Sequence, residues 1–97
     1  MINIFCLCIN CNPVFIGTLK NIMGNRATLN LKNIRSEEMY SYFYSKDKSK
    51  TAMIDPDCIF YQVDSEFSRT ANNIIKIRKV YSFSDIPIIL LTSYSQF

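Results

Sequence analysis

Histidine and tryptophan are absent from the 97-residue sequence, and glycine occurs only twice. Without histidine, the chain lacks the side chain that most often acts as a general acid or base, so Ser-His-Asp and Cys-His mechanisms are excluded. The two glycines, Gly17 and Gly24, stand alone, and the chain therefore contains no glycine-rich phosphate-binding loop. These absences predict that the protein is not an enzyme.

Long apolar runs and strong charge are also missing. No apolar stretch approaches the roughly 18–20 residues of a membrane-spanning helix, and no secretory signal opens the chain. The net charge is +3, and the local basic cluster of Lys46, Lys48 and Lys50 is too weak to predict nucleic-acid binding. Four cysteines without a secretory signal indicate free thiols in a reducing compartment. We therefore expect a cytoplasmic protein without membrane contact.

Four short apolar segments predict strands. Residues 58–63 and 86–92 each follow a turn signal and carry a polar residue near the end, Gln62 and Thr92. That pattern is typical of strands buried on both faces of a parallel sheet, with functional groups at the carboxyl edge. Residues 2–9 predict another buried strand. Residues 27–31 alternate between apolar and polar side chains, which favours a half-exposed strand near an edge of the sheet.

A first helix is predicted over residues 13–23. Asn12 is suited to the N-cap, and a proline occupies the first helical position, where its missing N–H costs nothing. Apolar residues at helical spacing, including Val14 and Ile22, predict a buried stripe. Gly24 indicates the end of the helix.

Two more helices are predicted between the later strands. Ser36 is expected to cap the second, which buries Met39 and leads into a polar connector over residues 46–50. The third is expected over residues 71–80, after a loop at 64–70. Strands that alternate with helices predict an α/β fold, a doubly wound parallel sheet with helices on both faces.

This pattern resembles the receiver domain of two-component response regulators. The matching residues, in chain order, are Asn12 and Pro13, Pro56 and Asp57, Ile77 and Arg78, and residues 85–93. The resemblance covers nearly all 97 residues and implies a single flavodoxin-like domain, 1–97, with strand order 2-1-3-4. It also implies that the fifth strand and last helices of the family are missing, so that the domain is incomplete at its C-terminus.

The family's phosphorylation chemistry is not expected to carry over. The acidic pair that holds Mg²⁺ in receivers corresponds to Asn10 and Cys11, which are uncharged. The phosphoacceptor position corresponds to Gln62, whose amide cannot attack phosphorus as an aspartate does. Thr92 matches the family's hydroxyl position, but the lysine of the fifth strand has no counterpart. We therefore predict an inactive, degenerate pocket without catalytic residues, metal or cofactor.

Two alternatives keep a chemical role for the domain. Asp64 or Glu66, just past the phosphoacceptor position, could accept a phosphoryl group instead, although both are interpreted as solvated loop carboxylates. Cys11 could act as a thiol sensor, because a thiol near a helix start can have a lowered pKa.

The other cysteines favour a structural role. Cys6 and Cys8 lie two residues apart in one strand and are expected to point to the same face, into the core beneath a helix, with Cys58 on the neighbouring strand. Their spacing does not suit a zinc site, which prefers two pairs of ligands on tight turns.

The fourth strand is predicted to form an open, apolar edge, with Ile86, Ile88 and Leu90 exposed. Such an edge favours self-association, so we expect a homo-oligomer formed through it. The sequence therefore predicts a phosphorylation-independent pseudo-receiver, a protein–protein interaction module in signal transduction or transcription regulation. Its partner would be a second copy, another protein or an effector domain.

Overall fold

The computed structural model describes residues 2–24, 26–43, 55–80 and 85–92. Within them, four parallel strands form one sheet in the order β2-β1-β3-β4. The strands are β1 (Ile2–Ile9), β2 (Ala27–Ile34), β3 (Cys58–Gln62) and β4 (Ile88–Leu91). The helices are α1 (Pro13–Met23), the short 3₁₀ helix η1 (Ser36–Glu38), α2 (Met39–Phe43) and α3 (Phe67–Val80). This architecture confirms the predicted α/β class, the parallel sheet and the strand order.

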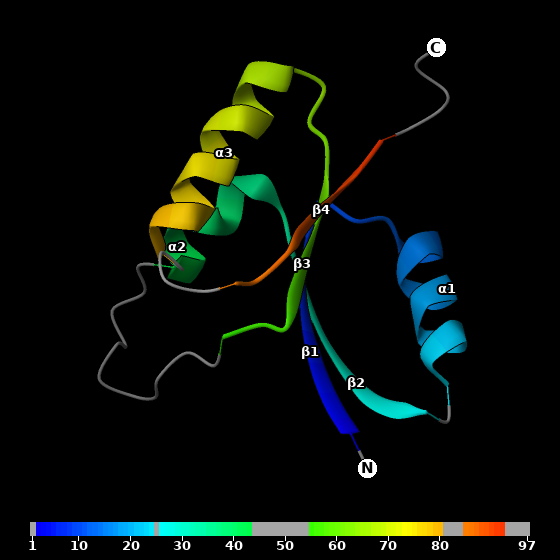
Figure 1. The fold of residues 1–97 in the computed structure, drawn as a ribbon. Coiled ribbons are helices and arrows are strands. Elements are labelled where there is room, and N and C mark those ends of the chain that lie inside the picture. The colour runs from blue at the N-terminus through cyan, green and yellow to red at the C-terminus, as the bar shows by residue number, and fades with distance from the viewer. Residues whose placement is uncertain (1, 25, 44–54, 81–84, 93–97) are drawn as a thin grey trace.

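The sheet lies between two helical layers (Figure 1). Helices α2 and α3 cover one face, and α1 lies against the other. The main apolar core is on the α2–α3 side, where the largest fully buried side chains, each with 0% exposure, are Leu7, Ile9, Ile59, Tyr61 and Ile77. The two central strands and α3 therefore build the core.

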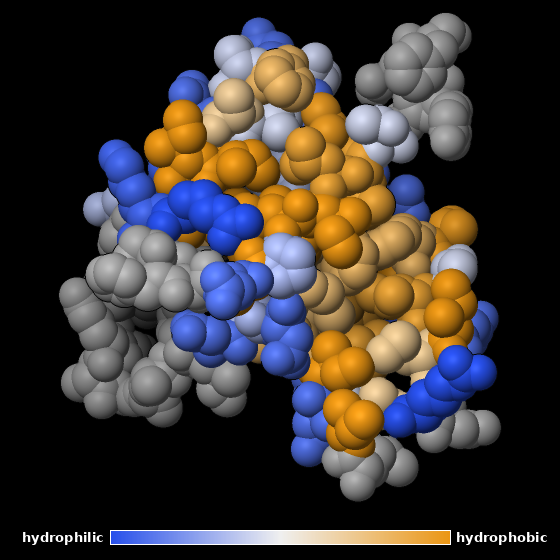
Figure 2. Space-filling model, viewed as in Figure 1, coloured by the Kyte–Doolittle hydropathy of each residue, from blue (hydrophilic) through white to orange (hydrophobic). Residues whose placement is uncertain are grey.

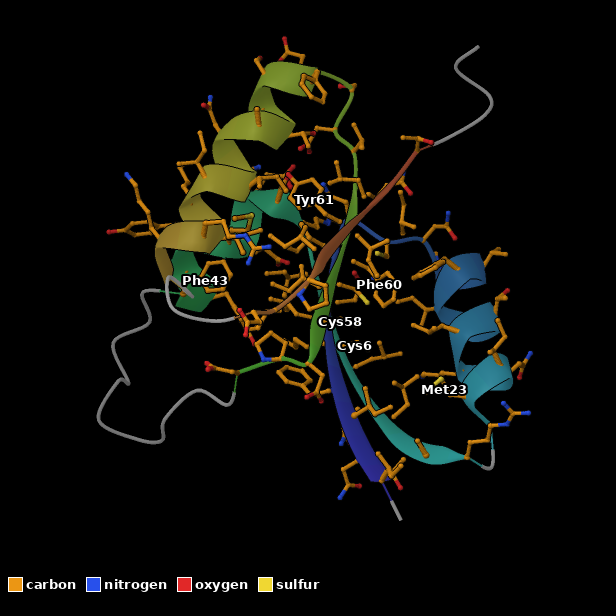
Figure 3. All side chains as sticks on the ribbon, in the orientation of Figure 1. Cys6, Met23, Phe43, Cys58, Phe60 and Tyr61 are labelled. Atoms are coloured by element: carbon orange, nitrogen blue, oxygen red, sulfur yellow. The ribbon has the colours of Figure 1, made fainter. Side chains whose placement is uncertain are left out.

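The face under α1 contains the thiols. Cys6 and Cys8 are buried, and they alternate along β1 with the core residues of the opposite face. Phe60 of β3, the ladder partner of Cys8, contacts Phe15 of α1 with ring centroids 5.2 Å apart. Figure 3 shows Phe60 on the α1 side of the sheet and Tyr61 on the α3 side. The prediction that Cys6 and Cys8 point into the protein beneath a helix is confirmed.

Helix α1 begins and ends as the sequence predicts. The Asn12 side chain accepts a hydrogen bond from the Phe15 main-chain N–H at 2.8 Å, and Gly24 at the C-cap has a φ of 36°. The predicted stripe is partly wrong, because Val14 and Ile22 are 77% and 66% exposed. The residues that turn toward the sheet are half-buried and are Phe15, Ile16, Leu19 and Met23.

The second helical segment starts differently from the prediction. Ser36 is not the cap but the first residue of η1, and its hydroxyl donates to Asp64 at 3.2 Å. The Glu38 carboxylate instead accepts the Arg35 main-chain N–H at 2.9 Å. Met39 is buried as predicted. The connector predicted over residues 46–50, including its lysine cluster, lies outside the described residues.

Two elements are longer than predicted. Helix α3 begins at Phe67 and not at residue 71, so the predicted loop at 64–70 is too long. Its first three residues are exposed and give no apolar periodicity. Strand β2 continues to Ile34, which pairs with Ile9 of β1 after the alternation in the sequence has stopped.

Strand β4 is shorter than predicted, and its exposure differs. Ile86 precedes the strand and is buried, so its predicted exposure is wrong; Arg78 donates to its main-chain oxygen at 2.8 Å. Ile88 is half-buried against the core, whereas Ile89 and Leu90 are 42% and 48% exposed. None of the described helices is long and apolar enough to cross a membrane.

Candidate functional site at the carboxyl edge

The carboxyl ends of the parallel strands meet at one edge of the sheet, where this class of fold places its functional groups. Asn10 follows β1, Ser36 lies just after β2, and Asp64 lies just after β3. Tyr61 of β3 and Thr70 of α3 also direct their hydroxyl groups to Asp64. We call these five residues the Asp64 cluster.

The carboxylate of Asp64 is the acceptor at the centre of this cluster. Its Oδ1 atom accepts hydrogen bonds from Asn10 Nδ2 at 3.0 Å and from Ser36 Oγ at 3.2 Å. Its Oδ2 atom accepts from the Tyr61 hydroxyl and from Thr70 Oγ1, the latter at 3.0 Å. Four donors therefore surround the two oxygens, and the interpretation of Asp64 as a solvated loop carboxylate is wrong.

Asn10 connects the ends of two strands to this carboxylate. Its backbone has a φ of 61°, a left-handed conformation that asparagine tolerates better than most residues. Its main-chain N–H donates to Ile34 at 2.8 Å, and its Oδ1 atom accepts the Ser36 main-chain N–H at 2.8 Å. Both ends of the Asn10 amide are thus used to hold β1, β2 and the loop after β3 together.

The hydrogen bonds determine the charge state of the cluster. Burial raises the pKa of Asp64, but the bonds from Tyr61, Thr70, Ser36 and Asn10 outweigh it and leave this pKa below its usual value. At neutral pH, Asp64 is therefore a carboxylate.

Tyr61 is shifted in the opposite direction. Burial, and next the bond to Asp64, raise the pKa of Tyr61. Tyr61 therefore stays protonated and can donate, while its hydroxyl accepts a bond from Asn73 Nδ2 at 2.8 Å. The chain of bonds thus runs from α3 through Tyr61 to the carboxyl edge.

The degenerate pocket predicted from the sequence is only partly assembled around this cluster. The Asn10 amide lies 3.5 Å from the main-chain oxygen of Gln62, and the Gln62 side chain offers no carboxylate. Thr92 is exposed one residue beyond Leu91, which is the ladder partner of Gln62. Cys11 is 6% exposed and directs its thiol to the main-chain oxygens of Ile9 and Phe60, at 3.7 and 3.6 Å.

The pKa of the Cys11 thiol is lowered, but by a different cause from the helix start on which the prediction rested, and the thiol is buried. Contact with Cys8 is the main cause that lowers the pKa of Cys11, and burial opposes it. The same contact, followed by burial, raises the pKa of Cys8. With 6% of its surface exposed, Cys11 is poorly placed to meet a reagent from solvent.

A cavity of about 580 Å³ opens beside the cluster, between the ends of β1 and β2 and the start of α1. Its charged lining comes from Arg35, Glu37 and Glu38, and Asn10 and Cys11 form part of its wall. Within the residues that the structure describes, no group of three or more cysteine, histidine, aspartate or glutamate side chains could hold a metal ion. The cavity therefore offers mixed charge without a cluster of metal ligands.

The second carboxylate considered from the sequence behaves as predicted. Glu66 is exposed and lies 3.8 Å from Arg69, one turn later, in an ion pair on the surface. It takes no part in the Asp64 cluster. Sequence reasoning missed the cluster itself, although one signal was present: polar residues follow three strands whose carboxyl ends must meet.

No protein-family model matches the chain, and no curated protein or solved structure matches it significantly. The receiver resemblance therefore stays a prediction, based on the sequence pattern and on an architecture that agrees with it.

Proposed function

We propose that the chain is a receiver-like interaction module that acts by contact, without phosphorylation or catalysis, and associates with a second copy of itself through β4. The observation that supports this proposal is that strand β4 has exposed apolar side chains and, within the part of the chain that the structure describes, an unpaired outer side. Ile89 and Leu90 point to opposite faces of the sheet and are both exposed, and among the described residues no strand pairs with the outer side of β4.

The opposite edge of the sheet provides a comparison. Strand β2 also has an unpaired outer side among the described residues, but its exposed side chains are polar: Thr28, Asn30 and Lys32 on one face. A polar edge with a lysine resists pairing with another chain, whereas a short apolar edge favours it. The apolar surface in Figure 2 covers β4 and continues toward α1. Association is therefore expected at β4 and not at β2.

The Asp64 cluster supports an unphosphorylated module. Each oxygen of Asp64 accepts two hydrogen bonds, which occupy its two lone pairs, so an attack on phosphorus would first have to displace a donor. Glu66 is free of the cluster and is a surface carboxylate beside Arg69, and among the described residues no group of three or more acidic, histidine or cysteine side chains could hold Mg²⁺. Phosphorylation of Asp64 would have to break hydrogen bonds of the Asp64 cluster, and this argues against the phosphoacceptor alternative.

The proposed compartment rests on the cysteines, and the proposed biological role rests on the receiver resemblance. All four thiols are free, which suits a reducing cytoplasm. A role in signal transduction or transcription regulation follows from the receiver resemblance, and an effector domain or another protein could occupy the β4 edge in place of a second copy. These partners differ in the mass of the complex that they form.

Native mass spectrometry of the purified chain, before and after incubation with Mg²⁺ and acetyl phosphate, tests the proposal. We expect a dimer or higher assembly whose mass does not change on incubation. A phosphoryl adduct would show that the domain is a working switch and would direct attention to Asp64 and Glu66. A monomeric mass at all concentrations would rule out self-association through β4.

A matched pair of variants locates the contact. Leu90→Lys adds a charge to the exposed apolar edge, and Asn30→Lys adds the same charge to the polar edge on the same face of the sheet. Because a buried leucine stabilises a contact by about 2 kcal/mol, Leu90→Lys should weaken association at least tenfold. Asn30→Lys should leave the assembly unchanged.

A further inference from the structure

Two thiols from distant parts of the sequence meet in the centre of the sheet. Cys6 in β1 and Cys58 in β3 are partners in the parallel ladder, and their sulfur atoms lie 3.5 Å apart. Figure 3 shows the two residues side by side, on neighbouring strands. Both are free cysteines in this structure. Nothing in the proposed contact function uses this pair.

The backbone holds the pair in register. Just before it, the main-chain N–H of Asp57 donates to the Phe5 oxygen at 2.8 Å, and the Phe5 N–H donates to the Asp57 carboxylate at 2.8 Å. Just after it, Leu7 pairs with Ile59, and both are fully buried. Neighbouring strands lie about 4.7–4.9 Å apart, within the Cα separation of about 4.4–6.8 Å that disulfides allow. A bond between the two sulfurs would therefore need side-chain rotation and no shift of strand register.

The two thiols differ in access. Cys6 is 3% exposed, whereas Cys58 is only half-buried and can meet a reagent from solvent. Burial, and next the hydrogen bond with Cys58, raise the pKa of Cys6 to about 12. Either thiol can donate the hydrogen bond between the two sulfurs, and Cys58 is the nucleophile because it is the one that a reagent from solvent can reach.

We propose that Cys6 and Cys58 are a redox-active thiol pair that hydrogen peroxide converts to an intramolecular disulfide. The sulfur of Cys58 attacks one peroxide oxygen, the O–O bond breaks, and one water leaves, so that Cys58 becomes a sulfenic acid. The sulfur of Cys6 then attacks that of Cys58, the S–O bond breaks, and a second water leaves with the Cys6 proton. Two thiols are oxidised by two electrons in total, and one peroxide is reduced to two waters.

The remaining cysteines do not compete for this role. Cys8 is fully buried, and Cys11 is 6% exposed and directs its thiol to main-chain oxygens. The pair also differs from the Cys11 sensor considered from the sequence, because Cys58 supplies the access that Cys11 lacks. Cys8→Ala/Cys11→Ala therefore provides a matched control that keeps only the proposed pair.

The test uses the full reduced chain and an equimolar amount of hydrogen peroxide. Intact-mass analysis should show the loss of two hydrogens, and alkylation after denaturation should count two free thiols in place of four. Trypsin should release residues 1–20 linked to residues 51–69, and fragment ions from cleavage beside Leu7 should place the bridge at Cys6. Dithiothreitol should restore the original mass.

The variants sharpen the result. Cys8→Ala/Cys11→Ala should keep the two-hydrogen loss, and Cys58→Ala should lose it completely. Four free thiols after treatment, oxygen adducts without a bridge, a bridge to Cys8 or Cys11, or a bridge between two molecules would each overturn the proposal. The wild-type measurement decides the question even if a variant does not fold.

Discussion

The two faces of the sheet differ in how completely they are covered. On the α2–α3 face, Leu7, Ile59 and Ile77 are fully buried. On the other face, α1 has no buried residue, and Val14 is 77% exposed. The same central strands thus carry a closed apolar core on one side, and on the other side buried thiols beneath a helix that has no buried residue of its own.

This difference suggests that one face of the sheet stabilises the fold, whereas the other face and the β4 edge provide association and thiol chemistry. Burial of apolar surface is the main favourable term in folding, so the α2–α3 face should carry most of the stability. The α1 face and the adjoining β4 edge contribute less and are therefore the parts that can be used for association and for reaction with solvent. Substitutions on the two faces should show this directly.

The largest effect is expected in the core of the α2–α3 face. Ile77→Ala removes a fully buried side chain from α3 and leaves a cavity, so the free energy of unfolding should fall by about 3–4 kcal/mol. Ile75→Ala on the same helix, where the side chain is 54% exposed, should cost less than about 1 kcal/mol. Urea unfolding at a fixed protein concentration measures both. Equal losses for the two variants would contradict the account of this face.

The Asp64 cluster, which connects the strand ends to the α2–α3 layer, should have the next largest effect. Asp64→Asn removes the charged acceptor of four side-chain donors and should lower stability by about 2 kcal/mol at pH 7. Glu66→Gln changes an exposed carboxylate and should stay within about 0.5 kcal/mol.

The pH dependence of the same variants gives a second check. The pKa of Asp64 is lower in the folded protein than in the unfolded chain, so its contribution is present above the unfolded value of about 3.9. It is lost as pH falls through the lowered folded value. Wild-type stability should therefore fall more steeply below about pH 4 than that of Asp64→Asn. Parallel pH profiles would contradict the assigned charge state.

The smallest effect is expected on α1. Asn12→Ala removes the acceptor for the Phe15 N–H and should cost about 1 kcal/mol. Val14→Ser, at an exposed position of the same helix, should change stability by less than about 0.5 kcal/mol. Urea unfolding gives the values. A loss for Val14→Ser as large as that expected for Ile77→Ala would mean that the α1 face also carries a closed core.

Much of the fold could be predicted because apolar runs and helix caps are local signals. The strand starting at Cys58 and the helix between Asn12 and Gly24 begin where the sequence indicates. The start of α3 was missed because Phe67 is 69% exposed and begins a first turn with no apolar stripe. The end of β2 was missed because Ile34 is buried on the face opposite to Leu31, after the alternation breaks.

The candidate site was harder to predict. The sequence correctly placed Gln62 at the end of a central strand, but the polar residues that follow three of the strands were the only sign that donors would surround Asp64. That cluster brings together Asn10 and Ser36 with residues of β3 and α3, separated by up to 54 positions along the chain from Asp64. The pairing of Cys6 with Cys58 depends likewise on strand register, which apolar runs alone do not fix.

Amide hydrogen exchange at two protein concentrations tests the β4 contact most directly, because it compares the two edge strands within one sample. If β4 pairs with a second copy, exchange in a peptide covering residues 86–92 should slow as the concentration rises. Exchange in a peptide covering residues 27–34, on the polar edge, should stay the same. Protection of β2, or the absence of any concentration dependence at β4, would contradict the account.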